Sequence, residues 1–168
     1  MNVYCASINL KVGQFNSIEN ASTSNNNIQF DMGLASDPAP SPNIQLVAVD
    51  PTPTTPLSEI RIHGRQGDWA ELTFILQDEN NLLVGAYFFN AQGNIIGDRE
   101  FPAVTLTASK DPQISTLTIT DYLHNIQGVD AYNYSLLVQN NLNQPNLASG
   151  NPGAIGIIDP TITVEIDD

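Results

Sequence analysis

Short runs in which apolar and polar residues alternate dominate this chain, and turn-forming residues separate them. Between residues 70 and 76 every even-numbered position is apolar, whereas Glu71 and Thr73 stand at odd-numbered ones. Period-two alternation is typical of a strand with one face in a core and the other in water. Residues 161–166 repeat the pattern, with Ile or Val at each even-numbered position. The chain is therefore predicted to be built mainly of strands.

The same pattern predicts further strands along the whole chain. They cover Val3–Leu10, Asn27–Asp31, Ile44–Val49, Glu59–His63, Leu82–Phe89, Ala103–Thr107, Ser115–Thr120 and Tyr132–Gln139. Leu82–Phe89 is the most apolar of them, which indicates a strand in the middle of a sheet. Proline clusters on both sides of Ile44–Val49 indicate an edge strand, because proline cannot donate to a sheet ladder. One short helix is predicted at Asp121–Gln127, with Asp121 as its N-cap and Gly128 as its stop.

Strands at this spacing predict an all-β fold, and residues 1–168 are expected to form a single domain. The expected architecture is an antiparallel two-sheet β-sandwich with at most one short helix. The segment from Ser115 to Tyr134 resembles the E–F corner of immunoglobulin-like sandwiches. In that corner a tyrosine hydroxyl bonds back to the preceding backbone. The resemblance implies an immunoglobulin-like sandwich.

Charge narrows the range of partners. The formal net charge is −13, and the chain has only five Lys and Arg residues. Nucleic acids and anionic membranes bind clustered Lys and Arg, so neither is expected as a partner. The sequence shows no signal-peptide pattern and no membrane-length apolar run, so a cytoplasmic location is expected. Cys5 is the only cysteine, and its place in a predicted strand indicates a small buried side chain.

The usual signatures of catalysis are absent from the sequence. It contains no G-x-S-x-G elbow, no P-loop and no H-E-x-x-H motif. His63, His124 and Cys5 are too few and too scattered for a typical zinc site. His63 follows Glu59 and Arg61 on the polar face of a predicted strand and is expected at the surface. No multiple-turnover active site is therefore predicted.

Residues 77–81 gather oxygen-bearing side chains at the end of a predicted strand, as calcium loops do. The candidate calcium ligands are Asp78, Glu79 and Asn81. Their spacing is not that of an EF-hand, so a solvated turn is the competing interpretation. Together with other acidic and amide-rich loops, this cluster suggests a calcium- or carbohydrate-binding module.

Asp-Pro occurs four times, at residues 37–38, 50–51, 111–112 and 159–160. This bond is chemically weak, because the Asp side chain can attack its own carbonyl carbon and the prolyl nitrogen is a comparatively basic leaving group. A fold that orients the carboxyl group lowers the barrier further. Three of the pairs lie among turn residues, whereas Asp159-Pro160 directly precedes a predicted strand. It is the candidate self-cleavage bond, and a proline that merely starts a strand is the competing interpretation.

The C-terminal segment also carries a family resemblance. The pattern Tyr132-x-Tyr134-x-Leu136, followed by Gly-rich turns and Asp-Pro-Thr-Ile-Thr-Val at 159–164, resembles the bacterial DP-EP family. It is also similar to the related inclusion-body (AidA/PixA-type) proteins. Both are small β-sandwiches, mostly of unassigned function.

The DP-EP resemblance implies self-cleavage at Asp159-Pro160, helped by a second carboxylate, with lysine capture of the new aspartyl end in some members. Two departures bear on this. Glu165-Ile166 stands where an E-P pair is expected, and residues 132–158 contain no lysine.

Three functions follow from the sequence. The first is a non-enzymatic β-sandwich that acts by binding or assembly, as a homo-oligomer through its exposed sheet edges. The second is an aspartic-peptidase-like protein that hydrolyses its own Asp159-Pro160 bond in a single turnover. The third is the calcium- or carbohydrate-binding module. The sequence identifies neither a small-molecule nor a protein partner.

Overall fold

Strands make up almost all of the regular structure. The computed structural model describes residues 1–15, 28–48, 58–89, 101–110, 113–124, 128–140, 155–158 and 161–166. The strands are β1 (Val3–Phe15), β2 (Ile28–Leu34), β3 (Ile44–Val47), β4 (Glu59–Gly64), β5 (Trp69–Gln77), β6 (Asn81–Phe89), β7 (Ala103–Lys110), β8 (Gln113–Tyr122), β9 (Gly128–Asn140), β10 (Ile155–Ile158) and β11 (Thr161–Ile166). No helix occurs in these ranges, so none there could span a membrane.

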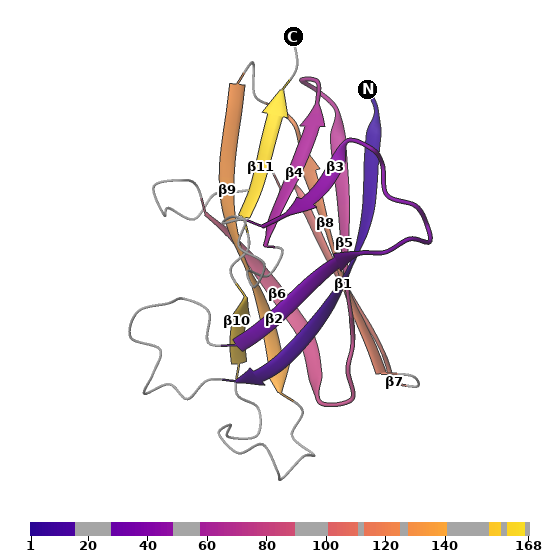
Figure 1. Cartoon of the computed structure of the whole chain (residues 1–168), viewed down its shortest axis with the longest axis vertical. Coiled ribbons are helices and arrows are strands. Elements are labelled where there is room, and N and C mark those ends of the chain that lie inside the picture. Colours follow the sequence, from indigo (N-terminus) through magenta and orange to yellow (C-terminus); the bar gives the residue numbers. More distant parts are fainter. Residues whose placement is uncertain are drawn as a thin grey trace.

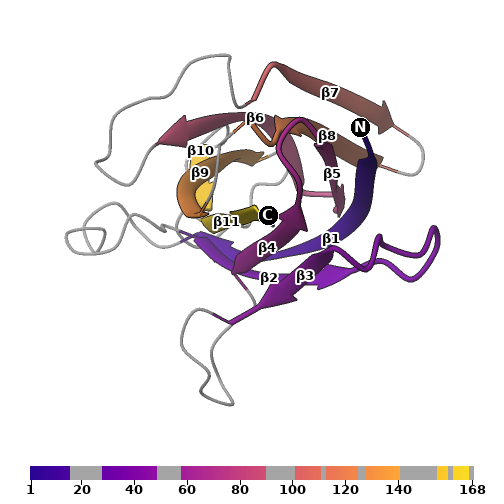
Figure 2. The ribbon, with the colours of Figure 1, turned by 90° about the horizontal axis from the view of Figure 1, so that it is seen from above.

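The strands form two sheets around one interior, which confirms the all-β sandwich (Figures 1 and 2). The first sheet has the order β2-β1-β5-β8-β7. In the second, β3-β4-β11-β9 lie side by side, and β9 also pairs with β10 and β6. Both sheets are mixed rather than purely antiparallel, because β1 runs parallel to β5 and β4 runs parallel to β11. Alternation fixes which side chains face the core, but it does not fix the direction of a neighbouring strand.

The core follows the alternation read from the sequence. In β5 the even-numbered residues 70–76 are buried, while Glu71 is exposed. Strand β11 has the predicted bounds, and its Ile162 and Val164 are buried. The largest fully buried side chains are Tyr134, Phe74, Ile8, Ile60, Ile62, Leu72, Leu76, Leu83, Leu117, Ile119, Leu123 and Leu136.

The helix predicted at Asp121–Gln127 is wrong over its described part. Asp121 and Tyr122 end strand β8, and residues 125–127 lie outside the described residues. The reason is that the β8 alternation continues to the end of the strand and one residue beyond. Asp121 and Leu123 are buried, whereas the Tyr122 ring lies beside that of Trp69, with centroids 4.5 Å apart.

The expectation that Cys5 is buried is also wrong. Cys5 is exposed, because Ala6, Ile8 and Leu10 take the inward positions of β1 and leave Cys5 on the outer face. The Tyr134 hydroxyl is buried and has no hydrogen-bond partner among the described residues. Burial raises the pKa of this phenol well above its ordinary value. The hydroxyl bond of an E–F corner, expected without a named tyrosine, stays a prediction.

Among the described strands β6 pairs only with β9, so the central strand expected at Leu82–Phe89 lies at an edge of the sheet as described. It is apolar on both faces because it lies where the two sheets meet and also contacts β5, β7 and β8. The backbone N–H of Leu83 donates to the Ser115 hydroxyl of β8 over 2.9 Å, which joins the sheets.

A buried carboxylate holds the start of β1 in place. Asp68 is 3% exposed, and it accepts hydrogen bonds from the Asn2 backbone N–H (2.6 Å) and the Tyr4 hydroxyl (2.7 Å). The Asn2 carbonyl in turn accepts from the Trp69 N–H, at the first residue of β5. The Leu123 N–H donates to the Asp68 carbonyl, so the end of β8 is tied to the same point. Three strands of the first sheet therefore meet at this residue.

These bonds predict an acid-sensitive stability. The donors, the Asn2 backbone N–H first, lower the pKa of Asp68 from 3.8 to about 2. A lowered pKa in the folded state means that the stabilisation is complete above about pH 4 and is lost as the pH falls towards 2. Asp68→Ala is expected to lower the free energy of unfolding at neutral pH by on the order of 3 kcal/mol, because several part-buried donors, among them the Asn2 backbone N–H and the Tyr4 hydroxyl, lose their acceptor together.

Urea unfolding of the wild type and of Asp68→Asn between about pH 4 and pH 2 tests this expectation. The wild type is expected to lose more stability over this range than the variant does. Parallel pH profiles would show that Asp68 does not carry the effect.

Candidate functional site

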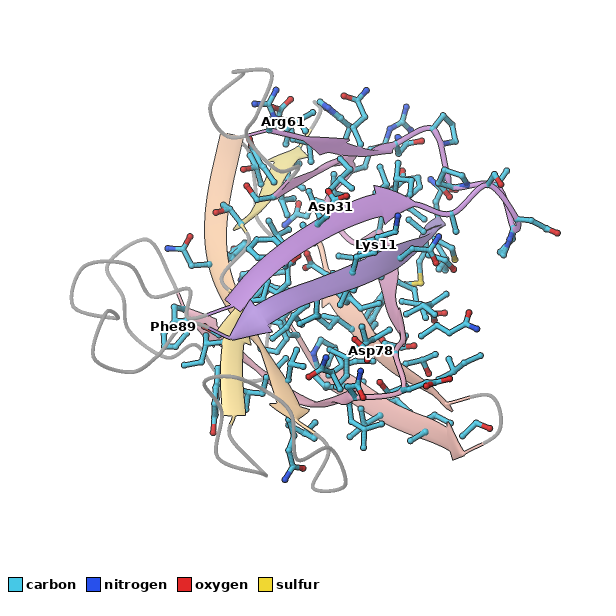
Figure 3. The ribbon with its side chains drawn as sticks, turned by 60° about the horizontal axis from the view of Figure 1, so that its bottom comes forward. Lys11, Asp31, Arg61, Asp78 and Phe89 are labelled. Carbon is cyan, nitrogen blue, oxygen red and sulfur yellow. The ribbon has the colours of Figure 1, made fainter. Side chains whose placement is uncertain are left out.

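Most exposed sheet edges of this fold are protected against pairing with another chain. Strand β3 has only four residues, and the pairing of β6 with β9 is interrupted by a bulge between Leu83 and Gly85. Strand β2 carries the exposed Asp31 beside Lys11 of β1, and both side chains point outward in Figure 3. Short strands, bulges and charges are the usual means by which proteins block edge-to-edge association.

Strand β7 lacks these protections. It pairs with β8 on one side, and no described strand pairs with its other side. All residues from Ala103 to Ser109 are exposed, on both faces of the strand. Figures 1 and 2 show β7 at the outside of the molecule with β8 as its neighbour.

The inward face of β7 is apolar and only partly covered. Val104 and Leu106 are 43% and 46% exposed, although they lie opposite the buried Ile119 and Leu117 of β8. The start of the strand is anchored by Phe101, which is buried and stacks on Phe88 with ring centroids 4.1 Å apart. Strand β6 of the second sheet contacts β7 but leaves Val104 and Leu106 partly exposed. An apolar stripe beside a free backbone edge is an interaction surface by its chemistry.

The β7 edge also lies in an uncharged part of an acidic chain. No charged residue occurs between Glu100 and Lys110, or between residues 113 and 120 of the paired strand. A partner strand can therefore approach this edge without placing two carboxylates together. We call the unpaired side of residues 103–109, with the side chains of Val104 and Leu106, the β7 edge.

The outer face of the second sheet, by contrast, satisfies its own charges. Arg61 donates to Glu59 over 3.0 and 3.2 Å, and the Thr163 hydroxyl donates to Glu59 over 2.9 Å. These donors, Arg61 first, lower the pKa of Glu59. His63 lies at the surface, as expected, with its Nδ1 3.0 Å from Glu165. Glu165, which stands in place of the E-P pair, thus has the His63 ring as a close polar neighbour.

A shallow hollow of about 150 Å³ lies beside Cys5, between the first sheet and residues Pro38 and Ala39. Burial and, to a smaller extent, the neighbouring Glu71 raise the pKa of the Cys5 thiol. The thiolate is therefore disfavoured here, and the site lacks the chemistry of a nucleophilic cysteine.

Asp78 makes the turn between β5 and β6, near the label in Figure 3. Its Oδ1 accepts from the backbone N–H groups of Asn80 and Asn81, and its Oδ2 accepts from the Asn81 side-chain amide over 2.8 Å. Side chains that bond to the backbone in this way stabilise tight turns. Among the described residues no three His, Cys, Asp or Glu side chains gather as metal ligands. The geometry favours the turn, and the calcium site with Glu79 stays a prediction.

The other sequence-predicted sites lie wholly or partly outside the described residues. Asp159 and Pro160 are among the omitted positions, as are residues 16–27 and 141–154, which hold most of the amide-rich loops of the carbohydrate hypothesis. The flanks of the Asp-Pro bond are described. Ile158 pairs with Leu136 of β9, and Thr161 pairs with Asn133 of β9. The separation from Ile158 to Thr161 in the sequence equals that from Asn133 to Leu136. Strands β10 and β11 thus keep one register along β9.

Comparisons with known proteins identify one distant likeness. No family model matches the chain, and no curated protein matches it. The crystal structure of an inclusion body protein (PixA) from Burkholderia cenocepacia J2315 is similar to it with a TM-score of 0.44 and 10% sequence identity. The match covers 99% of this chain and 98% of that one. This neighbour is of the inclusion-body kind that the C-terminal segment resembles, and nothing in the comparisons bears on the DP-EP resemblance.

The Asp78 geometry predicts a structural effect that does not depend on calcium. Asp78→Ala is expected to lower the free energy of unfolding by about 1 to 2 kcal/mol, because three donors of the turn lose their acceptor. Thermal unfolding with and without millimolar Ca²⁺ checks this. A ligand that binds only the folded state must raise its Tm. A calcium-dependent rise in the wild type that disappears in Asp78→Ala would establish the metal site instead.

If the Asp159-Pro160 bond is hydrolysed, residues 160–168 are expected to stay attached. Strand β11 pairs with β9 on one side and with β4 on the other, and its Ile162 and Val164 are 0% and 2% exposed. Cleavage would therefore leave gel filtration unchanged, while denaturing mass spectrometry shows two pieces. Asp159→Asn is expected to slow the reaction, and Asp111→Asn is the matched control. A chain that stays intact through prolonged incubation at mildly acidic pH refutes self-cleavage.

Proposed function

We propose that this protein is a non-enzymatic binding module that takes an extended partner strand onto the β7 edge. The observation that carries the proposal is that residues 103–109 are exposed on both faces, while the other described edges are short, bulged or charged. Main-chain hydrogen bonds supply affinity in this mode of recognition, and the side chains along the strand supply selectivity. The proposal leaves the charged face of the second sheet without a direct role.

The composition of the edge defines the kind of partner. Val104 and Leu106 offer apolar contact on one face of β7, and Thr105 and Thr107 offer hydroxyl groups on the other. A partner with apolar and hydroxyl-bearing side chains in alternation matches both faces. Cross-strand Thr–Thr and aliphatic pairs each add a fraction of a kcal/mol to such pairing. Strand β8, which pairs with the other side of β7, already has this alternation of apolar and hydroxyl-bearing side chains.

A peptide with the sequence of residues 113–122, the natural neighbour of β7, is the direct probe. Protein labelled with a fluorophore at the exposed Cys5 and held at nanomolar concentration is titrated with this peptide. We expect saturable binding that 1 M NaCl leaves in place, because the edge is uncharged. Leu106→Lys is expected to weaken binding at least tenfold, since it places a charge at the centre of the edge.

Val3→Lys is the matched control for this titration. Val3 is an exposed apolar residue of the same sheet, but it lies on β1, and two strands separate β1 from β7. Both variants place their ammonium groups in water and are expected to fold. A peptide that does not bind the wild type, or binds Leu106→Lys equally well, overturns the proposed function.

A further inference from the structure

The sequence of β7 is nearly symmetric about its centre. Positions at equal distance from Leu106 carry similar residues. Thr105 corresponds to Thr107, Val104 to the small Ala108, and Ala103 to the small Ser109. If two copies of this strand pair antiparallel with their Leu106 residues opposite each other, threonine meets threonine on one face. Aliphatic side chains meet on the other face. No charged residue between positions 103 and 109 enters the pairing.

The fold already contains a pair of this composition. On its occupied side, β7 lies against β8 with Thr105 opposite Thr118, Leu106 opposite Leu117 and Thr107 opposite Thr116. A second copy of β7 offers the same Thr-Leu-Thr sequence to the free side. The β7 edge would therefore meet there the same three side chains that it meets on β8.

We infer that the strand bound at the β7 edge is the β7 of a second copy of this chain, paired antiparallel across a two-fold axis at Leu106. This inference rests on the proposed function and names its partner. The pairing would join the two five-stranded sheets into one continuous sheet. It would also place the exposed Leu106 of each copy against that of the other.

The assembly ends at two copies. An antiparallel pair of identical strands is isologous, so each copy uses its β7 edge once and leaves no second one for growth. The remaining described edges are β2, β3, β6 and β10. Strand β2 carries charge, β6 is bulged, and β3 and β10 have only four residues each, features that block addition. Because each copy carries a charge of −13, salt is expected to strengthen the dimer by screening the repulsion between copies.

Cysteine cross-linking in a Cys5→Ser background tests the register. Residues directly opposite in an antiparallel pair have Cα atoms about 4.5 to 5.5 Å apart, within the range of a disulfide. Leu106→Cys is therefore expected to form a covalent dimer on mild oxidation. Val104→Cys alone is not, since its own copy lies four residues away along the partner strand, about 13 Å. A mixture of Val104→Cys and Ala108→Cys chains is expected to cross-link to each other.

Sedimentation equilibrium of the wild type, run in low and in high salt, supplies the second readout. We expect a monomer–dimer equilibrium that salt shifts towards the dimer and that Leu106→Lys abolishes. A monomer at all concentrations, in a chain that still binds the 113–122 peptide, overturns the homodimer and keeps strand addition. A dimer without the Leu106→Cys cross-link, or growth beyond two copies, also overturns the inference. Loss of both peptide binding and dimer removes the proposed function as well.

Discussion

The first sheet depends on one buried carboxylate. Strands β1 and β5 run parallel, and parallel neighbours need a long connection that leaves their relative register free. Asp68 fixes that register, because its hydrogen bond to Tyr4 joins positions 64 apart in the sequence. A slip of one residue would turn Ile8 and Leu10 of β1 out of the core and Cys5 and Asn9 into it. Close packing nearby adds to the constraint, since a side chain at Gly64 would collide with Leu123.

The sequence predicts the positions and faces of the strands better than it predicts which strands pair. Alternation located the described strands except β10 and assigned their faces, and Thr161–Ile166 matches β11 residue for residue. Alternation cannot report partners, so the two parallel pairs and the edge position of β6 did not follow from it. The helix prediction failed because local cap signals at Asp121 competed with a strand pattern that continued to Leu123.

The sequence predicted the type of the candidate site, an exposed strand edge, but not its position in the fold. The strand content predicted binding through an exposed sheet edge. It did not indicate which of the predicted strands lies at an edge. Only the assembled sheets show that Val104 and Leu106 stay 43% and 46% exposed while their β8 partners are buried. The competing candidate Asp78 has hydrogen-bond partners in its own turn that the sequence could not assign to it. With these partners it looks like an ordinary turn residue.

The pairing of β4 with β11 has a consequence for the order in which the chain folds. Thr163 bonds to Glu59 across 104 positions, and closing so large a loop is slow because its entropy is lost before the contacts form. The hairpin β7–β8 is local and needs no such search. A chain that has formed this hairpin but has not yet inserted β11 therefore already presents a finished β7 strand. Two newly made chains can then meet through their β7 strands before either sandwich is complete. The local concentration of newly made chains will therefore influence which contacts form first.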